Sequence, residues 1–219
     1  MGMRVKQSAL LLLAALGMGA CSSDQVDKAI DDRPKNRDTT ITFVNALNDD
    51  AGFYLHPHAM FGDVFRDKYK AVDLLSEDYG SYLYGWNKDY AKTTFGVRNK
   101  NSNNKSRKLD AHLADGGRTW VVAWMNGSNY ELSVFDKSPR NRADIISVRV
   151  LANADMDVAV DGKHISRVKS GKVSTHISVE QCNGTLSIAN RAINLCQQEY
   201  GRSYLLVADS DGARVIVEE

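Results

Sequence analysis

The stretch Gly117-Arg-Thr-Trp-Val-Val-Ala-Trp124 occurs a second time in this chain, in altered form, as Gly201-Arg-Ser-Tyr-Leu-Leu-Val-Ala208. Each run leads to a dipeptide, Asn126-Gly127 or Asp211-Gly212, and then to a segment of alternating apolar residues. Asn-Gly and Asp-Gly between apolar runs are typical of tight β-hairpins, because their central residues adopt positive φ. Each copy of the repeat is therefore predicted to end in a hairpin.

The repeat extends upstream of these hairpins. The segment from Ile41 to Ala46 corresponds to the segment from Val148 to Ala154, and Phe95-Gly-Val-Arg-Asn99 corresponds to Leu186-Ser-Ile-Ala-Asn190. A further hairpin is predicted at Asp161-Gly162. Helical periodicity is scarce, so we predict an all-β protein of two tandem, immunoglobulin-like, antiparallel β-sandwich domains.

The N-terminus has a different composition from the rest of the chain. Arg4 and Lys6 precede an apolar stretch from Ser8 to Ala20, which is too short to span a bilayer, and Cys21 follows directly. This pattern resembles a bacterial lipoprotein signal, and the resemblance implies that residues 1–20 are removed and that Cys21 carries the lipid. Ordinary secretory cleavage after Ala20 is the alternative.

The same resemblance predicts the location of the protein. In that family an Asp directly after the acylated cysteine retains the protein in the inner membrane, and here Ser22 stands in that place. We therefore expect lipid anchoring in the outer membrane, facing either the periplasm or the cell surface.

These patterns divide the chain into four parts. We predict a signal peptide over residues 1–20, a flexible lipidated tether over 21–38, a first β-sandwich over 39–138 and a second over 142–219. The tether prediction rests on the polar, charged composition of this segment. One helix is predicted within the first domain, at 63–75, from the rough three-to-four spacing of its apolar residues.

Charge and cysteine content narrow the function classes. The 28 Lys and Arg residues nearly balance the 27 Asp and Glu residues, so nucleic acid is not expected as a partner. With Cys21 assigned to the lipid, Cys182 and Cys196 remain as a pair in an oxidising compartment. We predict a disulfide between them, worth about 3 kcal/mol in the chain-entropy model for a loop of roughly 15 residues.

A family resemblance covers most of the chain after Thr39. The second copy carries Asn153-Ala154, then Asp157-Val-Ala-Val-Asp-Gly162, then Gly201-Arg-Ser-Tyr204. This order resembles domain-of-unknown-function family 4397, found in secreted and surface proteins and often in tandem. The first copy departs from it, because Phe53-Tyr-Leu55 replaces the aspartate-centred strand. The resemblance implies a surface module and no particular reaction.

Aromatic residues are unevenly distributed, and this is the main functional signal. Twelve of the eighteen lie between Phe43 and Phe95. Tyr82, Tyr84 and Trp86 alternate along one predicted strand and so share a face. If exposed, they form a stacking platform for sugar rings or a partner peptide. If that face is turned inward, they are simply part of the core.

A second candidate site is His56-Pro-His58-Ala-Met60. Two imidazoles and a thioether at alternate positions suit a soft metal such as copper, if the chain is extended. A turn around Pro57 is the competing interpretation, and no cofactor is predicted. For catalysis, Ser166-Arg-Val-Lys169 is the one spacing of interest, and it lies beside a predicted hairpin rather than at the start of a helix. No catalytic residue is therefore predicted.

Together these observations favour a non-catalytic cell-envelope lipoprotein that binds or assembles a protein or polysaccharide partner. Two alternatives stay open. One is an accessory protein of exopolysaccharide modification or export, a class that this chain resembles in its size and tandem layout. The other is a periplasmic copper-handling protein.

Overall fold

The computed structural model describes residues 23–102 and 104–219, and almost all of its regular structure is β. The elements are α1 (Ser23–Asp31), β1 (Arg37–Asn45), β2 (Ala51–Pro57), η1 (Asp67–Tyr69), β3 (Lys70–Leu74), β4 (Tyr79–Trp86), η2 (Lys88–Tyr90), β5 (Lys92–Asn99), β6 (Ser106–His112), β7 (Gly117–Asn126), β8 (Asn129–Asp136), β9 (Ile146–Ala152), β10 (Met156–Val160), β11 (Lys163–Val168), β12 (Ile177–Val179), β13 (Leu186–Ile188), β14 (Arg191–Ala192), β15 (Ser203–Asp209) and β16 (Gly212–Glu218).

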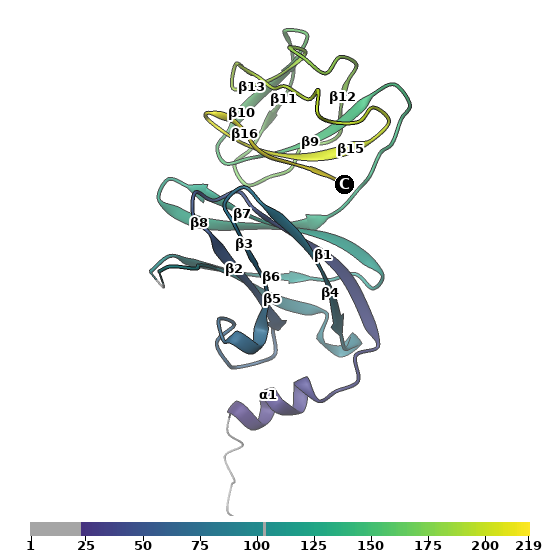
Figure 1. Cartoon of the computed structure of the whole chain (residues 1–219). Coiled ribbons are helices and arrows are strands. Elements are labelled where there is room, and N and C mark those ends of the chain that lie inside the picture. Colours follow the sequence, from purple (N-terminus) through teal and green to yellow (C-terminus); the bar gives the residue numbers. More distant parts are fainter. Residues whose placement is uncertain (1–22, 103) are drawn as a thin grey trace, which may run out of the picture.

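The strands form four four-stranded sheets, two in each β-sandwich (Figure 1). Domain 1 contains β4-β1-β7-β8 and β3-β2-β5-β6, and domain 2 contains β12-β9-β15-β16 and β11-β10-β13-β14. The second pair of sheets repeats the order of the first, strand for strand. The predicted all-β fold of two sandwiches is confirmed. Among the described strands, β1 with β7 and β9 with β15 are the two parallel pairs in otherwise antiparallel sheets.

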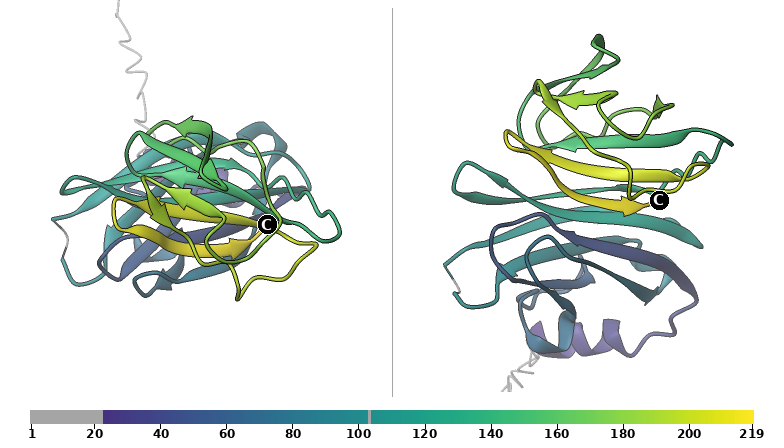
Figure 2. Two further views of the ribbon diagram at one scale, coloured as in Figure 1. Left: turned by 90° about the horizontal axis from the view of Figure 1, so that it is seen from above. Right: turned by 45° about the horizontal axis from the view of Figure 1, so that its top comes forward.

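Three hydrophobic cores separate the four sheets. One fills domain 1 and one fills domain 2. The third lies between the domains, where the sheet containing β7 packs on the sheet containing β15, so that the sheets stack as successive layers (Figure 2). Its fully or nearly fully buried residues are Val44, Ala46, Trp120, Val122, Trp124, Leu151, Leu205, Val207, Val215 and Val217.

This third core explains the continuous apolar runs at the heart of the repeat. Six successive residues of β7, from Thr119 to Trp124, are buried, because one face of the strand fills domain 1 and the other fills the interface. Strand β15 is buried on both faces in the same way. A strand covered on both sides needs no polar alternation.

Polar contacts also hold the two domains together. The carbonyl of Gly171 in domain 2 accepts a hydrogen bond from Ser133 Oγ (2.9 Å), which itself accepts from Trp124 Nε1 (3.0 Å). Gly171 has φ +68°, and a Cβ there would lie 2.7 Å from the Trp124 ring. Only glycine therefore permits this close approach.

The connection between β8 and β9 is bound to domain 2. Glu219 accepts from Arg149 Nε (2.6 Å) and from the backbone N–H of Ser138 (2.7 Å), while Arg149 also donates to the carbonyl of Asp136 (3.0 Å). The Glu219 side chain is fully buried and that of Arg149 is 9% exposed. This buried ion pair ties the connection to strand β9.

The two copies correspond in space with a different register from the one that their sequences suggest. Gly116 donates to Asp38 O (2.9 Å) as Gly201 donates to Ile145 O (2.9 Å), and both glycines have positive φ. Gly201 is thus the counterpart of Gly116, not of Gly117. Trp120 consequently corresponds to Leu205 in the interface, whereas sequence matching pairs it with Tyr204, which lies in the core of domain 2.

The predicted hairpins form, with small shifts in their turn residues. Asp161 and Gly162 have φ values of 50° and 72° and join β10 to β11 as expected. In the β7–β8 hairpin Asn126 pairs with Asn129, which makes Gly127 and Ser128 the turn residues. In the β15–β16 hairpin Asp209 pairs with Gly212, so the turn is Ser210-Asp211.

Two local predictions are wrong. Residues 23–31 of the expected tether form helix α1, which packs on the end of domain 1 farthest from domain 2 (Figure 1). Ile30 in this helix is buried with Met60 and Tyr69, and these tertiary contacts outweigh the polar composition of the segment. The helix expected at 63–75 is instead the short turn η1 followed by β3, whose residues pair with β2.

Candidate binding cavity at the α1 end of domain 1

Strand β4 positions the three aromatic residues that the sequence singles out. It is the edge strand of its sheet, paired with β1, and its alternate side chains Tyr82, Tyr84 and Trp86 turn toward the facing sheet. Tyr84 is 8% exposed and Trp86 is 5% exposed, while Tyr82 is half-buried. An exposed stacking platform is therefore not present, and the core interpretation holds for Tyr84 and Trp86.

The same three side chains form one wall of a cavity of about 300 Å³. Leu55 and His56 of β2 lie on the opposite sheet, and Tyr69 of η1 joins them. The remaining boundary comes from the end of α1 and the segment after it, and from the turn after β4. These further lining residues include Ile30, Asp31, Arg33, Lys35, Lys68, Lys70, Asn87 and Tyr90. The cavity lies where the two sheets of domain 1 separate, beside α1.

Hydrogen bonds hold the walls in place. Trp86 Nε1 donates to Thr39 Oγ1 (3.1 Å), and that hydroxyl donates to the carbonyl of Ala114 (2.7 Å). Asn87 donates through Nδ2 to Pro34 O (2.8 Å), which connects the segment after α1 to the end of β4. The cavity is thus a preformed feature of the sandwich rather than a gap between mobile loops.

Two polar groups at the cavity are left with hydrogen-bonding capacity. His56 is 4% exposed, and its Nδ1 must carry the proton because it contacts the carbonyl of Pro57 (2.7 Å). Its Nε2 then remains as an acceptor in the neutral ring. The hydroxyl of Tyr69, whose ring centroid lies 4.9 Å from that of His56, is buried and has no hydrogen-bond partner in the described part of the chain.

Charge at the cavity is mainly positive. Four cationic residues line it, namely Arg33, Lys35, Lys68 and Lys70, against the single carboxylate of Asp31. Lys68 donates to Asp31 (3.1 Å) and lies 4.5 Å from the Tyr69 ring centroid. Among the described residues, no carboxylate lies within ion-pair distance of Lys35.

Burial keeps Tyr84, one of the tyrosines that line the cavity, in its neutral form. Removal from water raises the pKa of Tyr84 far above its ordinary value, since a phenolate is costly in an apolar setting. The Tyr84 hydroxyl is therefore a proton donor at any physiological pH. The arrangement can bind a small polar ligand by ring contacts, hydroxyl donors and cationic side chains.

The predicted metal ligands His56, His58 and Met60 are not assembled into a metal site. His56 binds Pro57 O and faces Tyr69, whereas the exposed His58 lies 3.0 Å from Asp110 and 3.2 Å from Lys92 Nζ. Met60 is buried against Ile30 of α1. The chain turns after Pro57, so the alternation needed for a shared ligand face is lost. Over residues 23–102 and 104–219, no cluster of three or more His, Cys, Asp or Glu residues is arranged to hold a metal ion.

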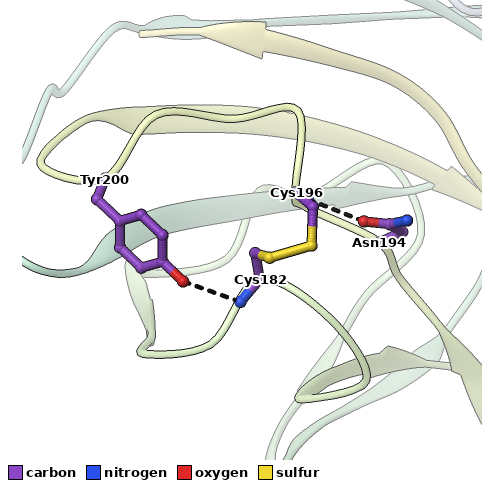
Figure 3. The surroundings of a disulfide bond; sticks show 4 residues. All are labelled: Cys182, Asn194, Cys196 and Tyr200. Carbon is purple, nitrogen blue, oxygen red and sulfur yellow. Dashed lines mark hydrogen bonds between the residues drawn. A yellow bond between two sulfur atoms is a disulfide. The ribbon is translucent and has the colours of Figure 1, made fainter.

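The predicted disulfide between Cys182 and Cys196 is confirmed (Figure 3). The N–H of Cys182 donates to the Tyr200 hydroxyl (3.1 Å), and the N–H of Cys196 donates to Asn194 Oδ1 (2.8 Å). The bond closes the end of domain 2 that follows β12. The other cysteine, the predicted lipid acceptor Cys21, lies outside the described residues.

The sequence indicates one wall of the cavity, the aromatic residues of β4, and not the others. The sequence pattern indicates His56 only as a metal ligand, and Tyr69 and Tyr90 lie outside the alternating residues of β4. Lys35 lies in the segment whose composition predicts a tether. The enrichment of aromatic residues before Phe95 is the available signal, because both of the cavity's further aromatic residues, Tyr69 and Tyr90, come from this region.

Comparisons with known proteins do not assign the chain to a group: no protein-family model matches it, and no curated protein is similar to it. Within residues 23–102 and 104–219, no helix has the length and apolar character needed to cross a membrane.

Proposed function

We propose that this protein is a non-catalytic cell-envelope lipoprotein, anchored in the outer membrane through Cys21, that binds a polysaccharide partner. The observation that carries the proposal is the preformed cavity of domain 1, with aromatic walls and a cationic rim. Either face of the outer membrane is compatible with it. A protein partner remains the alternative ligand class.

The size and chemistry of the cavity favour one acidic sugar unit. A volume of about 300 Å³ lies at the small end of ligand sites and suits a single ring rather than a long chain. The rings of Tyr82 and Trp86 offer apolar faces, and the Tyr69 hydroxyl supplies an unsatisfied polar group. Lys35 supplies a cation that suits a carboxylate on the sugar.

The same features support a second candidate function, that of an accessory protein of exopolysaccharide modification or export. Such a protein holds an acidic polysaccharide while other components act on it. A binding role rather than an enzymatic one is supported by the cavity's lining, because Asp31 is its one carboxylate among the described residues and glycoside hydrolases use a pair. Copper handling is not proposed, because the structure gives His56, His58 and Met60 separate partners.

The proposal is tested by calorimetry with acidic and neutral oligosaccharides chosen from a glycan array. Tyr82→Ala removes one ring from the wall, and we expect it to weaken binding about tenfold, which corresponds to ~1.4 kcal/mol. Lys35→Ala is expected to weaken binding of the acidic sugar and to leave a neutral one unaffected.

Tyr79→Ala is the matched control. Tyr79 lies on the same strand and is 52% exposed, but it does not line the cavity. We expect this variant to bind like the natural protein. Equal loss of binding in the Tyr79 and Tyr82 variants, or an array without any bound glycan, contradicts the polysaccharide proposal.

The resemblance to domain-of-unknown-function family 4397 stays a prediction. It is compatible with a surface-exposed binding module, since the family is found in secreted and surface proteins. It says nothing about the ligand.

A further inference from the structure

Helix α1 and adjoining residues of domain 1 border a mainly apolar groove, whose polar lining residues are Gln25 and Arg33. Val26, Ala29 and Ile30 of the helix line it together with Ala59 and Tyr90. The groove measures about 420 Å³ and is open to the surroundings. Phe61, the most exposed large apolar residue of the described chain at 73%, lies beside the same helix.

The exposed position of Phe61 is built into the structure. The buried carboxylate of Asp27 in α1 accepts from the backbone N–H of Phe61 (2.7 Å) and from that of Gly62 (2.8 Å). A Cβ at Gly62 would lie 2.6 Å from Asp27 Oδ2, so the loop approaches the helix as closely as glycine allows. The backbone at Phe61 is therefore fixed by the buried carboxylate of Asp27, and the exposed position of the Phe61 side chain is part of the ordered structure.

Charges around the groove largely neutralise one another. Asp24 pairs with Arg66 (3.5 Å), Asp31 with Lys68 (3.1 Å), and Arg33 with Asp89 (3.6 Å). The surface therefore lacks the excess of lysine and arginine that attracts proteins to anionic lipid by charge. Its attraction to a partner must come mainly from apolar contact.

The position of Cys21 identifies the partner. This cysteine is two residues before Ser23, the first residue of α1, and two residues span at most about 7 Å. An acyl chain on Cys21 thus brings the start of α1 to the lipid headgroups and leaves no room for a protein between them. Domain 2 lies at the opposite end of the molecule (Figure 1).

We infer that the α1 end of domain 1, with Phe61, Ala29 and the exposed edge of Val26, is a membrane-contact surface seated on the lipid bilayer. This inference rests on the lipid anchor of the proposed function. The apolar side chains enter the interfacial layer of the bilayer, as those of amphipathic surface helices do. The molecule then stands on the membrane without a flexible spacer, and its cavity opens near the headgroups.

The test uses the acylated full chain in vesicles of phosphatidylethanolamine and phosphatidylglycerol. Phe61→Cys introduces the single reactive thiol, because Cys21 is acylated and Cys182 is bonded to Cys196. A nitroxide label at position 61 is expected to be several-fold more accessible to lipid-soluble oxygen than to a water-soluble nickel chelate. High salt should change this ratio little.

Ile165→Cys is the matched control, since Ile165 is also an exposed apolar residue (51%) but lies in β11 of the outermost sheet. A label there is expected to have the reverse preference. Ala29→Glu in the Phe61→Cys background places a charge in the groove, and we expect it to move the label toward water.

Mass spectrometry of the N-terminal peptide separates the two ways in which the inference can fail. An acylated Cys21 with labels at 61 and 165 equally exposed to water overturns the membrane contact and leaves the anchor intact. An unmodified Cys21 overturns the proposed anchor, and the contact with it.

Discussion

The two domains share one strand order but fill the space beside their edge strands differently. Tyr82 and Tyr84 of β4 pair with Ile41 and Thr39 of β1, and the same positions of β12 hold Ile177 and Val179, which pair with Val148 and Ile146. In domain 2 these aliphatic side chains are buried and close the core. In domain 1 the tyrosines line a cavity. The side chains at two equivalent positions thus differ between a sandwich with a filled core and one with a cavity.

The ends of the two sandwiches differ in a related way. The same backbone hydrogen bond closes this end in each domain: Leu113 donates to Ala91 O (3.0 Å), and Leu195 donates to Cys182 O (2.8 Å). Domain 2 carries its disulfide here, between Cys182 and the residue after Leu195. Domain 1 has alanines at both corresponding places, and α1 packs nearby instead. Domain 2 is therefore closed by a covalent bond at this end, whereas domain 1 has no such bond at the corresponding position.

The largest expected effect comes from the core that joins the domains. Trp120 is fully buried between them, and Trp120→Ala is expected to lower the free energy of unfolding by about 3 to 5 kcal/mol. Because the lost contacts belong to both domains, denaturant unfolding should move to lower concentration as one coupled transition. Trp120→Phe, which keeps an aromatic ring in the interface, is the control and is expected to lose less. If domain 2 unfolds separately at an unchanged midpoint, the interface is not a shared core.

The buried ion pair of domain 2 is next in size. Glu219→Gln leaves Arg149 without its countercharge inside the protein, and we expect a loss of about 3 kcal/mol in thermal or denaturant unfolding. Glu218→Gln is the neighbouring control, because its pair with Arg202 is exposed on both sides and should contribute less than about 1 kcal/mol. Equal effects of the two variants would show that Arg149 and Glu219 are not buried in solution.

Removing the disulfide tests the covalent closure of domain 2. Cys182→Ser with Cys196→Ser is expected to reduce the free energy of unfolding by about 2 to 3 kcal/mol, since the unfolded chain regains the freedom of the closed loop. Ligand binding by domain 1 should be unaffected. In the natural protein, a free-thiol assay should find neither cysteine reactive, and labelling of the pair would contradict the bond.

The smallest effect is expected from introducing a disulfide into domain 1 at the positions that correspond to Cys182 and Cys196. Ala91→Cys with Ala114→Cys places cysteines where domain 2 has its own, and an added disulfide should stabilise domain 1 by about 1 to 2 kcal/mol. The measurements are the thiol count and the unfolding midpoint with and without reductant. Two persistent free thiols would show that the two ends are less alike than their shared hydrogen bond indicates.

The presence of α1 is a further difference between the two domains. Only domain 1 carries α1, and the proposed ligand cavity and the inferred membrane contact both lie at that end. Domain 2, packed on the other side of domain 1, then faces away from the bilayer. If the inferred membrane contact forms, the two copies of the fold have different surroundings.

By itself, the sequence determined the all-β fold, the two copies and the disulfide. Apolar runs with turn dipeptides such as Asp161-Gly162 indicate strands and hairpins, because they reflect local backbone preferences. Two cysteines left over in an oxidising compartment indicate a disulfide. Neither inference requires knowledge of distant contacts. It also pointed to the aromatic strand around Tyr84. It did not give the register of the repeat, because a shift of one residue exchanges the two faces of a strand while leaving the pattern of a doubly buried strand unchanged.

Only the tertiary structure decided what those strands and side chains contact. Trp120 joins the interface rather than a domain core because a second sheet covers β7, and no local pattern carries that information. Helix α1 forms in a polar segment because Ile30 is buried against Met60 and Tyr69, which lie far along the chain. The cavity itself exists because His56, Tyr69 and the wall of β4 converge from separate strands and turns, and such convergence is a property of packing rather than of sequence order.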